Sequence, residues 1–189
     1  DSTFWLRDEN GDLAPGWGDD TDGDGKVERD EVRFMLVDFT KERVQDLLAQ
    51  KALALKRCGL FDGIMLDWWK EGHATSGRWP NWNGTLLTPA EETRARLNIL
   101  KKIRAQVGDE FLILVNSNDS KVPRSAPYVN GLFMECYRPA YDKGYTHQQL
   151  MKIENTLLWA ENNLKEPHIN CLEGWRIVTD YDGDVQTRV

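Results

Sequence analysis

The sequence lacks several features that mark common functional classes. No apolar run approaches the roughly 20 residues that a membrane-spanning helix needs, and no signal segment is visible. Neither a G-x-S-x-G motif nor a GxxxxGK[ST] motif is present, so serine-triad and phosphate-loop chemistry are not indicated. The three histidines, His73, His147 and His168, are widely spaced and form no metal-binding pattern.

Basic residues and cysteines are also few. Lys and Arg number 24 against 31 Asp and Glu, and the resulting net charge of −7 argues against nucleic acid or an anionic membrane as partner. Cys58, Cys136 and Cys171 show no CxxC spacing and lie in or beside apolar stretches, so we expect buried free thiols. The chain begins at Asp1 rather than methionine, so we expect a mature product or an excised piece, in an extracellular or periplasmic location.

Short apolar runs alternate with amphipathic stretches along most of the chain. Five runs have the length of buried strands: Phe34–Val37, Phe61–Leu66, Phe111–Val115, Gly131–Met134 and Ile169–Leu172. Helical patterns cover residues 41–58, 88–107 and 146–164, and the last two begin with capping boxes. This order predicts right-handed βαβ units and a parallel sheet.

The number of units limits the fold. A closed (β/α)8 TIM barrel takes about 250 residues, and this chain has 189. We therefore expect one α/β domain over residues 1–189, either an incomplete parallel barrel of about five β/α units or an open parallel sheet.

Residues 20–31 match the EF-hand loop pattern D-x-[DN]-x-[DN]-G-x5-E without a mismatch. Ca²⁺ takes hard oxygen ligands, and the pattern supplies them at alternate positions. The expected ligands are Asp20, Asp22, Asp24, the Lys26 carbonyl, Glu28 and Glu31. No helix precedes the loop, so we expect a single inserted calcium site with a structural role. A solvated acidic loop is the alternative.

Polar side chains follow each expected strand. Chemistry in parallel α/β folds gathers at the carboxyl ends of strands. The residues there are Asp38, Asp67, Asn116, Glu135 and Glu173. Glycosidic cleavage needs two carboxyl groups, and Asp67 and Glu135 come from non-adjacent strands that can face each other. The alternatives are a helix cap for Asp38 and salt bridges for Asp67 and Glu135, while Glu173 favours neither interpretation.

Aromatic residues gather near the same strand ends. The sequence has eight tryptophans, and sugar rings stack their C–H faces on aromatic rings. The residues that we expect to contact a sugar in this way include Trp68, Trp69, Tyr137 and Trp175. The alternative is that some of these rings cover the barrel as ordinary core.

Three segments resemble strands of known barrel glycosidases. Residues 59–67, Gly-Leu-Phe-Asp-Gly-Ile-Met-Leu-Asp, resemble the G-x-DGI-x-x-D strand of the hypothetical glycosyl hydrolase family 15 group and of the endo-α-1,4-galactosaminidases of glycoside hydrolase families 114 and 135. Val37–Thr40 resembles the strand before it, and Asn130–Glu135 resembles a later strand that ends in a catalytic glutamate.

The resemblance implies strands three to seven of an eight-stranded barrel. It implies Asp67 as nucleophile or charge stabiliser, Glu135 as acid/base, and retention of anomeric configuration. Asp38, Trp68, Trp69, Asn116, Tyr137, Glu173 and Trp175 would then line the substrate site. The calcium loop departs from the family pattern, as does the lack of the first two strands and the last.

The leading hypothesis is a glycoside hydrolase acting on a polysaccharide or oligosaccharide, with structural Ca²⁺. The alternatives are a non-catalytic carbohydrate-binding or structural barrel and a calcium-dependent interaction module. An incomplete barrel exposes sheet edges, so we expect self-association or a partner segment to cover them.

Overall fold

The computed structural model describes residues 2–7, 10–18, 21–23, 29–72, 87–135 and 145–173. The chain forms two compact units, residues 1–53 with 70–106, and residues 54–69 with 107–189. The elements are η1 (Ser2–Phe4), β1 (Pro15–Gly18), η2 (Arg29–Glu31), β2 (Val32–Met35), α1 (Glu42–Cys58), β3 (Gly63–Leu66), α2 (Pro89–Val107), β4 (Leu112–Asn116), η3 (Ala126–Tyr128), β5 (Gly131–Met134), α4 (His147–Asn163) and β6 (Cys171–Leu172).

The first unit begins with a small antiparallel sheet. β1 and β2 pair antiparallel, and isolated bridges join Trp5 to Val37 and Arg7 to Leu13. The prediction that Phe34–Val37 belongs to the parallel sheet is therefore wrong. The N-terminal segment supplies the hydrogen-bond partner of this run, and Phe34 is 50% exposed rather than covered on both faces.

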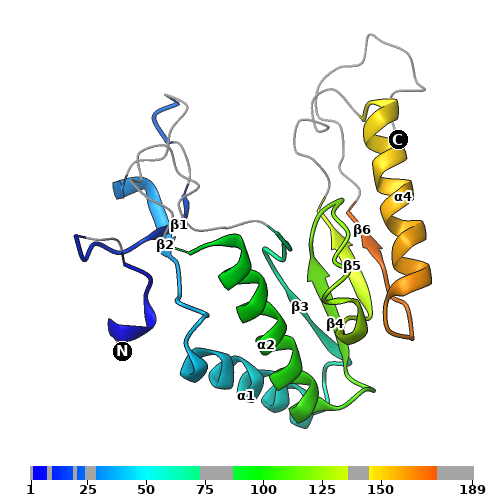
Figure 1. Cartoon of the computed structure of the whole chain (residues 1–189), viewed down its shortest axis with the longest axis horizontal. Coiled ribbons are helices and arrows are strands. Elements are labelled where there is room, and N and C mark those ends of the chain that lie inside the picture. The colour runs from blue at the N-terminus through cyan, green and yellow to red at the C-terminus, as the bar shows by residue number, and fades with distance from the viewer. Residues whose placement is uncertain are drawn as a thin grey trace. The chain divides into compact units, whose positions relative to one another are not determined.

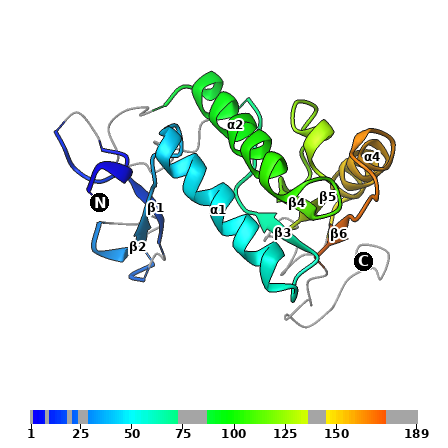
Figure 2. The same ribbon diagram turned by 90° about the horizontal axis from the view of Figure 1, so that it is seen from below.

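Helices α1 and α2 lie side by side in the first unit (Figures 1 and 2). The predicted helix boundaries are confirmed: Thr88 and Glu91 form the capping box of α2, and Gly59 and Gly108 end the two helices with φ of 69°. Lys102 Nζ on α2 bonds to Asp46 at 2.6 Å and to Glu42 at 3.1 Å on α1. These contacts join one helix to the other.

A buried ion pair strengthens α2 internally. Arg96 and Glu92, one turn apart, lie 2.9 Å from each other, and their side chains are 5% and 0% exposed. The Arg96 guanidinium also lies 5.3 Å from the centre of the Phe39 ring. Burial lowers the pKa of Arg96, and the charge of Glu92 opposes that shift. The negative charge of Glu92 therefore offsets part of the free-energy cost of burying the Arg96 cation.

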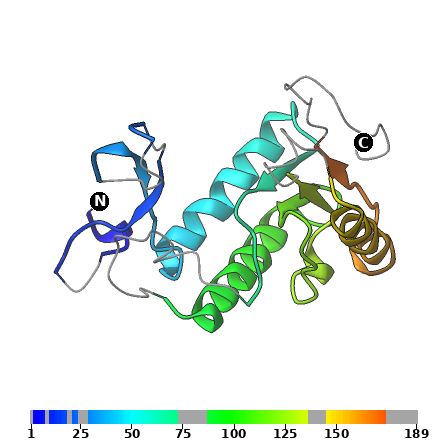
Figure 3. The ribbon, with the colours of Figure 1, turned by 90° about the horizontal axis from the view of Figure 1, so that it is seen from above.

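The second unit contains a parallel sheet with strand order β3-β4-β5-β6 (Figure 3). Four of the five predicted strands thus pair in parallel and in sequential order, as the alternation of strands and helices predicted. The helix α4 lies beside β5 and β6 in the views (Figures 1 and 3). Its capping box at Thr146 and Gln149 is also confirmed.

The two faces of this sheet differ in burial. Ile113, Val115, Leu132 and Met134 point to one face, and each is at most 1% exposed. Fully burying such a side chain contributes about 1.5–3 kcal/mol. The other face carries Met65, which is 47% exposed, and the half-buried Leu114 and Phe133. In the described part of this unit, the second face is therefore the more open one.

Gly131 sets the distance between β5 and the segment that enters β6. A Cβ atom at this position would lie 1.5 Å from the carbonyl oxygen of Ile169. Only glycine allows the two backbones to approach so closely. The same segment bonds backbone to backbone, from Ile169 N to Asn130 O at 2.9 Å.

Two smaller expectations concern the cysteines and the membrane. Cys58 is exposed at the last residue of α1, so its predicted burial is wrong; it lies on the helix end where residues 54–60 all face solvent. Cys171 is partly buried, and Cys136 lies outside the described residues. Within the described residues, no helix has the length and apolar character needed to cross a bilayer.

Candidate active site

Strand register places three polar residues on the open face of the sheet. Leu66 pairs with Val115, so Asp67 lies level with Asn116. Asn116 pairs with Phe133, and Glu135 follows two residues later on the same face. Because side chains alternate along a strand, Asp67, Asn116 and Glu135 all project from this face. They come from the carboxyl ends of three adjacent strands.

The side chain of Asn116 joins the two carboxylates. Its Nδ2 donates to Asp67 Oδ1 at 2.8 Å and to Glu135 Oε2 at 3.1 Å. The two N–H bonds of an amide diverge by about 120°, so the accepting oxygens lie roughly 5 Å apart and no more than about 6 Å apart. Asn116 is 6% exposed, whereas Glu135 is half-buried and Asp67 is exposed.

Asp67 receives a second donor from its own strand end. The backbone N–H of Trp68 donates to Asp67 Oδ1 at 2.7 Å. Trp68 has φ of 56°, a left-handed conformation that is rare for a bulky residue. The strand thus turns sharply after Asp67, and the turn directs an N–H group at the carboxylate.

The other predicted carboxylates occupy different settings. Glu173 follows β6, and the register of Phe133 with Cys171 continues to place Glu173 level with Glu135. Asp38 belongs to the first unit, where its Oδ1 accepts from Thr40 N at 3.2 Å and from Thr40 Oγ1 at 2.5 Å. These bonds form a local turn that precedes α1 rather than a helix cap, because Thr40 lies before Glu42, the first residue of the helix.

The predicted aromatic residues are only partly described. Trp69 is 4% exposed, its Nε1 donates to Ser125 Oγ at 2.9 Å, and its backbone N donates to Asn116 O at 2.8 Å. Its indole therefore packs in the core beside the strand ends. A ring buried in this way has no open face on which a sugar can stack. Trp68 is half-buried. Tyr137 and Trp175 lie outside the described residues.

The predicted calcium loop connects β1 to β2. Of its six predicted ligands, Asp22 and Glu31 are described, while Asp20, Asp24, Lys26 and Glu28 lie outside the described residues. Glu31 Oε1 accepts from the backbone N of Thr21 at 2.7 Å and also from Thr21 Oγ1. The last residue of the loop thus reaches back to its second. The described residues alone contain no group of three potential metal ligands.

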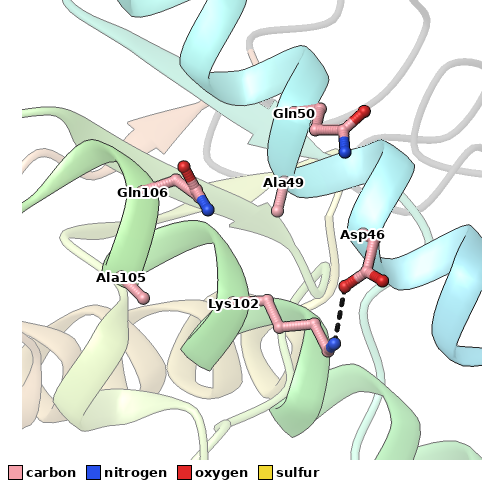
Figure 4. A pocket seen from close by; sticks show the side chains of 6 residues that line it. All are labelled: Asp46, Ala49, Gln50, Lys102, Ala105 and Gln106. Carbon is pink, nitrogen blue, oxygen red and sulfur yellow. Dashed lines mark hydrogen bonds and ion pairs between the residues drawn. The ribbon is translucent and has the colours of Figure 1, made fainter.

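A shallow groove lies between α1 and α2 in the first unit (Figure 4). Its volume is about 290 Å³, and it is lined by Asp46, Ala49, Gln50, Lys102, Ala105 and Gln106. The carboxylates of Asp46 and Glu42 neutralise the single cation in it, Lys102, and raise the pKa of that ammonium group through hydrogen bonds. This groove has no pair of groups suited to catalysis.

Sequence reasoning missed one residue of the site. Asn118 has φ of 52°, and its backbone N donates to Asn116 Oδ1 at 3.2 Å. An asparagine shortly after a strand is compatible with the left-handed region, but no residue pattern indicates that its N–H would meet Asn116.

Comparisons with known proteins identify no family for this chain. No family model matches the chain, and no curated protein matches it. Among solved structures, it is similar to the chitinase domain of the spore coat protein CotE from Clostridium difficile, with a TM-score of 0.49 and 14% identity. The match covers 72% of this chain and 44% of that domain. The chain thus spans less than half the length of the structure that it matches.

Proposed function

We propose that this chain is part of a glycoside hydrolase in which Asp67 and Glu135 break the glycosidic bond. The observation that carries the proposal is the pair of carboxyl groups that Asn116 holds together at the carboxyl ends of β3 and β5. Two carboxyl groups across the scissile bond are the usual apparatus for this reaction. The motif resemblance at residues 59–67 and 130–135 favours the same pair.

The separation of the pair favours retention of configuration. Retaining enzymes hold their carboxyl groups about 5–5.5 Å apart, whereas inverting enzymes leave about 6.5–9.5 Å for a water molecule. Both accepting oxygens lie within hydrogen-bond distance of a single nitrogen, at 2.8 and 3.1 Å. The nitrogen of Asn116 lies between those two oxygens, and their separation of roughly 5 Å matches the spacing of a retaining pair.

The reaction then proceeds in two displacements. A carboxylate oxygen of Asp67 attacks the anomeric carbon, the glycosidic C–O bond breaks, and Glu135 gives its proton to the departing oxygen. Water next attacks the anomeric carbon of the glycosyl ester and passes a proton to Glu135. Asp67 leaves as a carboxylate, and both side chains return to their starting state.

The substrate in this proposal is a polysaccharide or oligosaccharide. Trp68, Glu173, Tyr137 and Trp175 remain the proposed contacts with the sugar. We omit Trp69 because its indole is buried against Ser125. Asn116 contacts both carboxylates, so we do not include it among the residues that contact the sugar.

The architecture in this proposal is an incomplete (β/α)8 barrel. In such a barrel the inner face of the sheet carries the site and helices cover the outer face. The described sheet supports this arrangement, because the face that is buried on β4 and β5 is opposite to the face that carries Asp67, Asn116 and Glu135. Self-association or a partner segment that closes the barrel remains part of the proposal.

Calcium binding to residues 20–31 also belongs to the proposal. The contact between Glu31 and Thr21 supports it, because a closing glutamate must fold back over the start of the loop. We assign the ion a structural role in the first unit, with no step of the reaction passing through it.

Replacement of each carboxylate tests the catalytic proposal. We expect Asp67→Asn and Glu135→Gln each to lower kcat/KM by several orders of magnitude on a polysaccharide that the chain hydrolyses, while circular dichroism and Tm stay close to wild type. The matched control is Asp62→Asn, an exposed carboxylate at the opposite end of β3, which we expect to keep full activity.

Azide distinguishes the two roles. It should restore turnover of an activated glycoside in Asp67→Ala and give a glycosyl azide of inverted configuration, whereas in Glu135→Ala the azide product should keep its configuration. Full activity in both amide variants would refute the assignment. Binding of a glycan without hydrolysis by the wild type would favour a non-catalytic carbohydrate-binding barrel.

A further inference from the structure

We propose that Asn116 is a positioning residue that sets the separation of Asp67 and Glu135 and decides which oxygen of each carboxyl group reacts. This inference rests on the proposed function and extends it. Asn116 donates to both carboxylates and is 6% exposed. A side chain so placed acts on the substrate only through the two groups that it holds.

A hydrogen bond from the backbone N–H of Asn118 fixes the orientation of the Asn116 amide. A backbone N–H can only donate, so the amide atom that meets Asn118 N at 3.2 Å must be the carbonyl oxygen. The NH2 group is then forced toward the carboxylates. A reversed amide would direct its oxygen at both anions and its NH2 group at the N–H of Asn118.

Asn118 has an unusual backbone conformation that aims this N–H. Its φ is 52°, and its side-chain Oδ1 is buried without a hydrogen-bond partner among the described residues. The turn around it is closed by Ser117 Oγ, which donates to Ser120 O at 2.8 Å, and by Ser120 N, which donates to Ser117 O at 3.1 Å. Strained backbone that surrounding bonds hold in place is common where a functional group must be positioned.

Trp68, like Asn118, has a positive φ and directs its backbone N–H at a side chain of the site. In the described part of the chain, Trp68 and Asn118 are the non-glycine residues with positive φ. Each directs its backbone N–H to one member of the set, Trp68 to Asp67 and Asn118 to Asn116. Two strained residues thus serve one group of three side chains.

The bonds identify the reacting oxygens. Asp67 Oδ1 accepts from both Trp68 N and Asn116 Nδ2, which leaves Oδ2 to attack the anomeric carbon. Glu135 Oε2 accepts from Asn116, so the proton that Glu135 transfers is held on Oε1. An amide performs this task without charge, because it can hold two carboxyl groups apart and still donate to both.

Kinetics of Asn116→Asp test the inference. This variant keeps the shape and the acceptor for Asn118, but it donates to the pair only when protonated. We expect kcat to fall about a hundredfold or more, KM to stay within a few-fold, and the residual activity to shift to lower pH. Asn116→Ala should lose a similar factor without recovery in acid. Asn163→Ala, on an exposed position of α4, is the control and should retain kcat within about twofold.

A measurement independent of activity separates this inference from the proposed function. In ¹⁵N NMR spectra of the 189-residue chain, we expect two resolved and slowly exchanging protons on Asn116 Nδ2. Asp67→Ala should accelerate the exchange of one proton, and Glu135→Ala that of the other.

Rapid exchange of both protons in the wild type would overturn the inference, as would a wild-type kcat and pH profile in Asn116→Asp. Slow exchange of the Asn116 Nδ2 protons in a chain that cleaves no glycan would support the bridge from Asn116 to the two carboxylates. The same result would reject the proposed function.

Discussion

Two buried asparagines hold opposite ends of the parallel sheet. Asn116 bridges the carboxyl ends of β3 and β5, whereas Asn130 lies just before β5 and is 0% exposed. Asn130 Oδ1 accepts from Ile113 N at 3.1 Å. Its Nδ2 lies 3.2, 3.2 and 3.3 Å from the carbonyl oxygens of Lys165, Glu166 and Pro167. Asn130 thus joins β4, β5 and the segment before β6.

At the residue scale, Asn130→Ala should destabilise the second unit. The change leaves the buried N–H of Ile113 without its partner, at a cost of about 1–3 kcal/mol, and removes the bonds to the carbonyl groups of residues 165–167. Urea unfolding followed by circular dichroism measures the effect. The control is Asn163→Ala, which removes an exposed bond to Trp159 O and should change the free energy of unfolding by less than about 0.5 kcal/mol. Equal effects of the two changes would contradict this role for Asn130.

At the scale of an element, the N-terminus of α2 shows how a sequence pattern becomes an electrostatic effect. Thr88 N donates to Glu91 Oε2 at 2.8 Å, and Glu91 N donates to Thr88 Oγ1 at 3.2 Å. The bond from the Thr88 backbone is the largest of the effects that lower the pKa of Glu91. A lowered folded-state pKa contributes stability above the unfolded pKa and loses it as the pH falls through the folded value.

We expect Thr88→Ala to move the pKa of Glu91 only part of the way back toward its ordinary value, because alanine removes the Thr88 hydroxyl but keeps the backbone N–H, which is the larger effect. The loss of the cap should cost about 1 kcal/mol at neutral pH, and the difference from wild type should shrink in acid, where Glu91 is protonated in both proteins. NMR titration of Glu91 and unfolding at two pH values measure these effects. Glu154→Gln, on an exposed position of α4, is the control and should leave the titration of Glu91 unchanged. An identical Glu91 titration in both proteins would refute the prediction.

Elements were predicted well where local pattern decides them. Alternating apolar and capped segments indicated α1, α2, α4 and four parallel strands, because strand length, helical period and capping residues are local properties. The antiparallel pairing of β2 was missed because a short apolar run does not identify its hydrogen-bond partner.

The residues of the candidate site could be predicted from the sequence, but the hydrogen bonds that join them could not. Strand-end position identified Asp67, Asn116 and Glu135. The bridge by Asn116 depends on the two-residue stagger between β4 and β5, and the orientation of its amide depends on the φ of Asn118. Neither quantity can be read from residue types alone.

At the scale of the whole molecule, calcium should raise the stability of the first unit. A ligand that binds only the folded state stabilises it by about 2.7 kcal/mol at a hundred times its Kd. We expect Tm of chelator-treated protein to rise with added calcium, and the rise to be lost in Glu31→Gln. Magnesium at the same concentration is the control ion, because it requires stricter octahedral geometry. A Tm that does not respond to millimolar calcium would reject the site.

The register of β5 against β4 limits how the site can change in evolution. A slip of one residue would carry Glu135 about 3.3 Å along the strand and turn its side chain to the opposite face. That slip is resisted at the far end of the strand, where Gly131 admits the carbonyl of Ile169. In the proposed function, the positions of the two catalytic carboxylates would therefore depend on backbone pairing. Under the same proposal, mutation of the connections that follow each strand would change which glycan is accepted while the pair keeps its spacing.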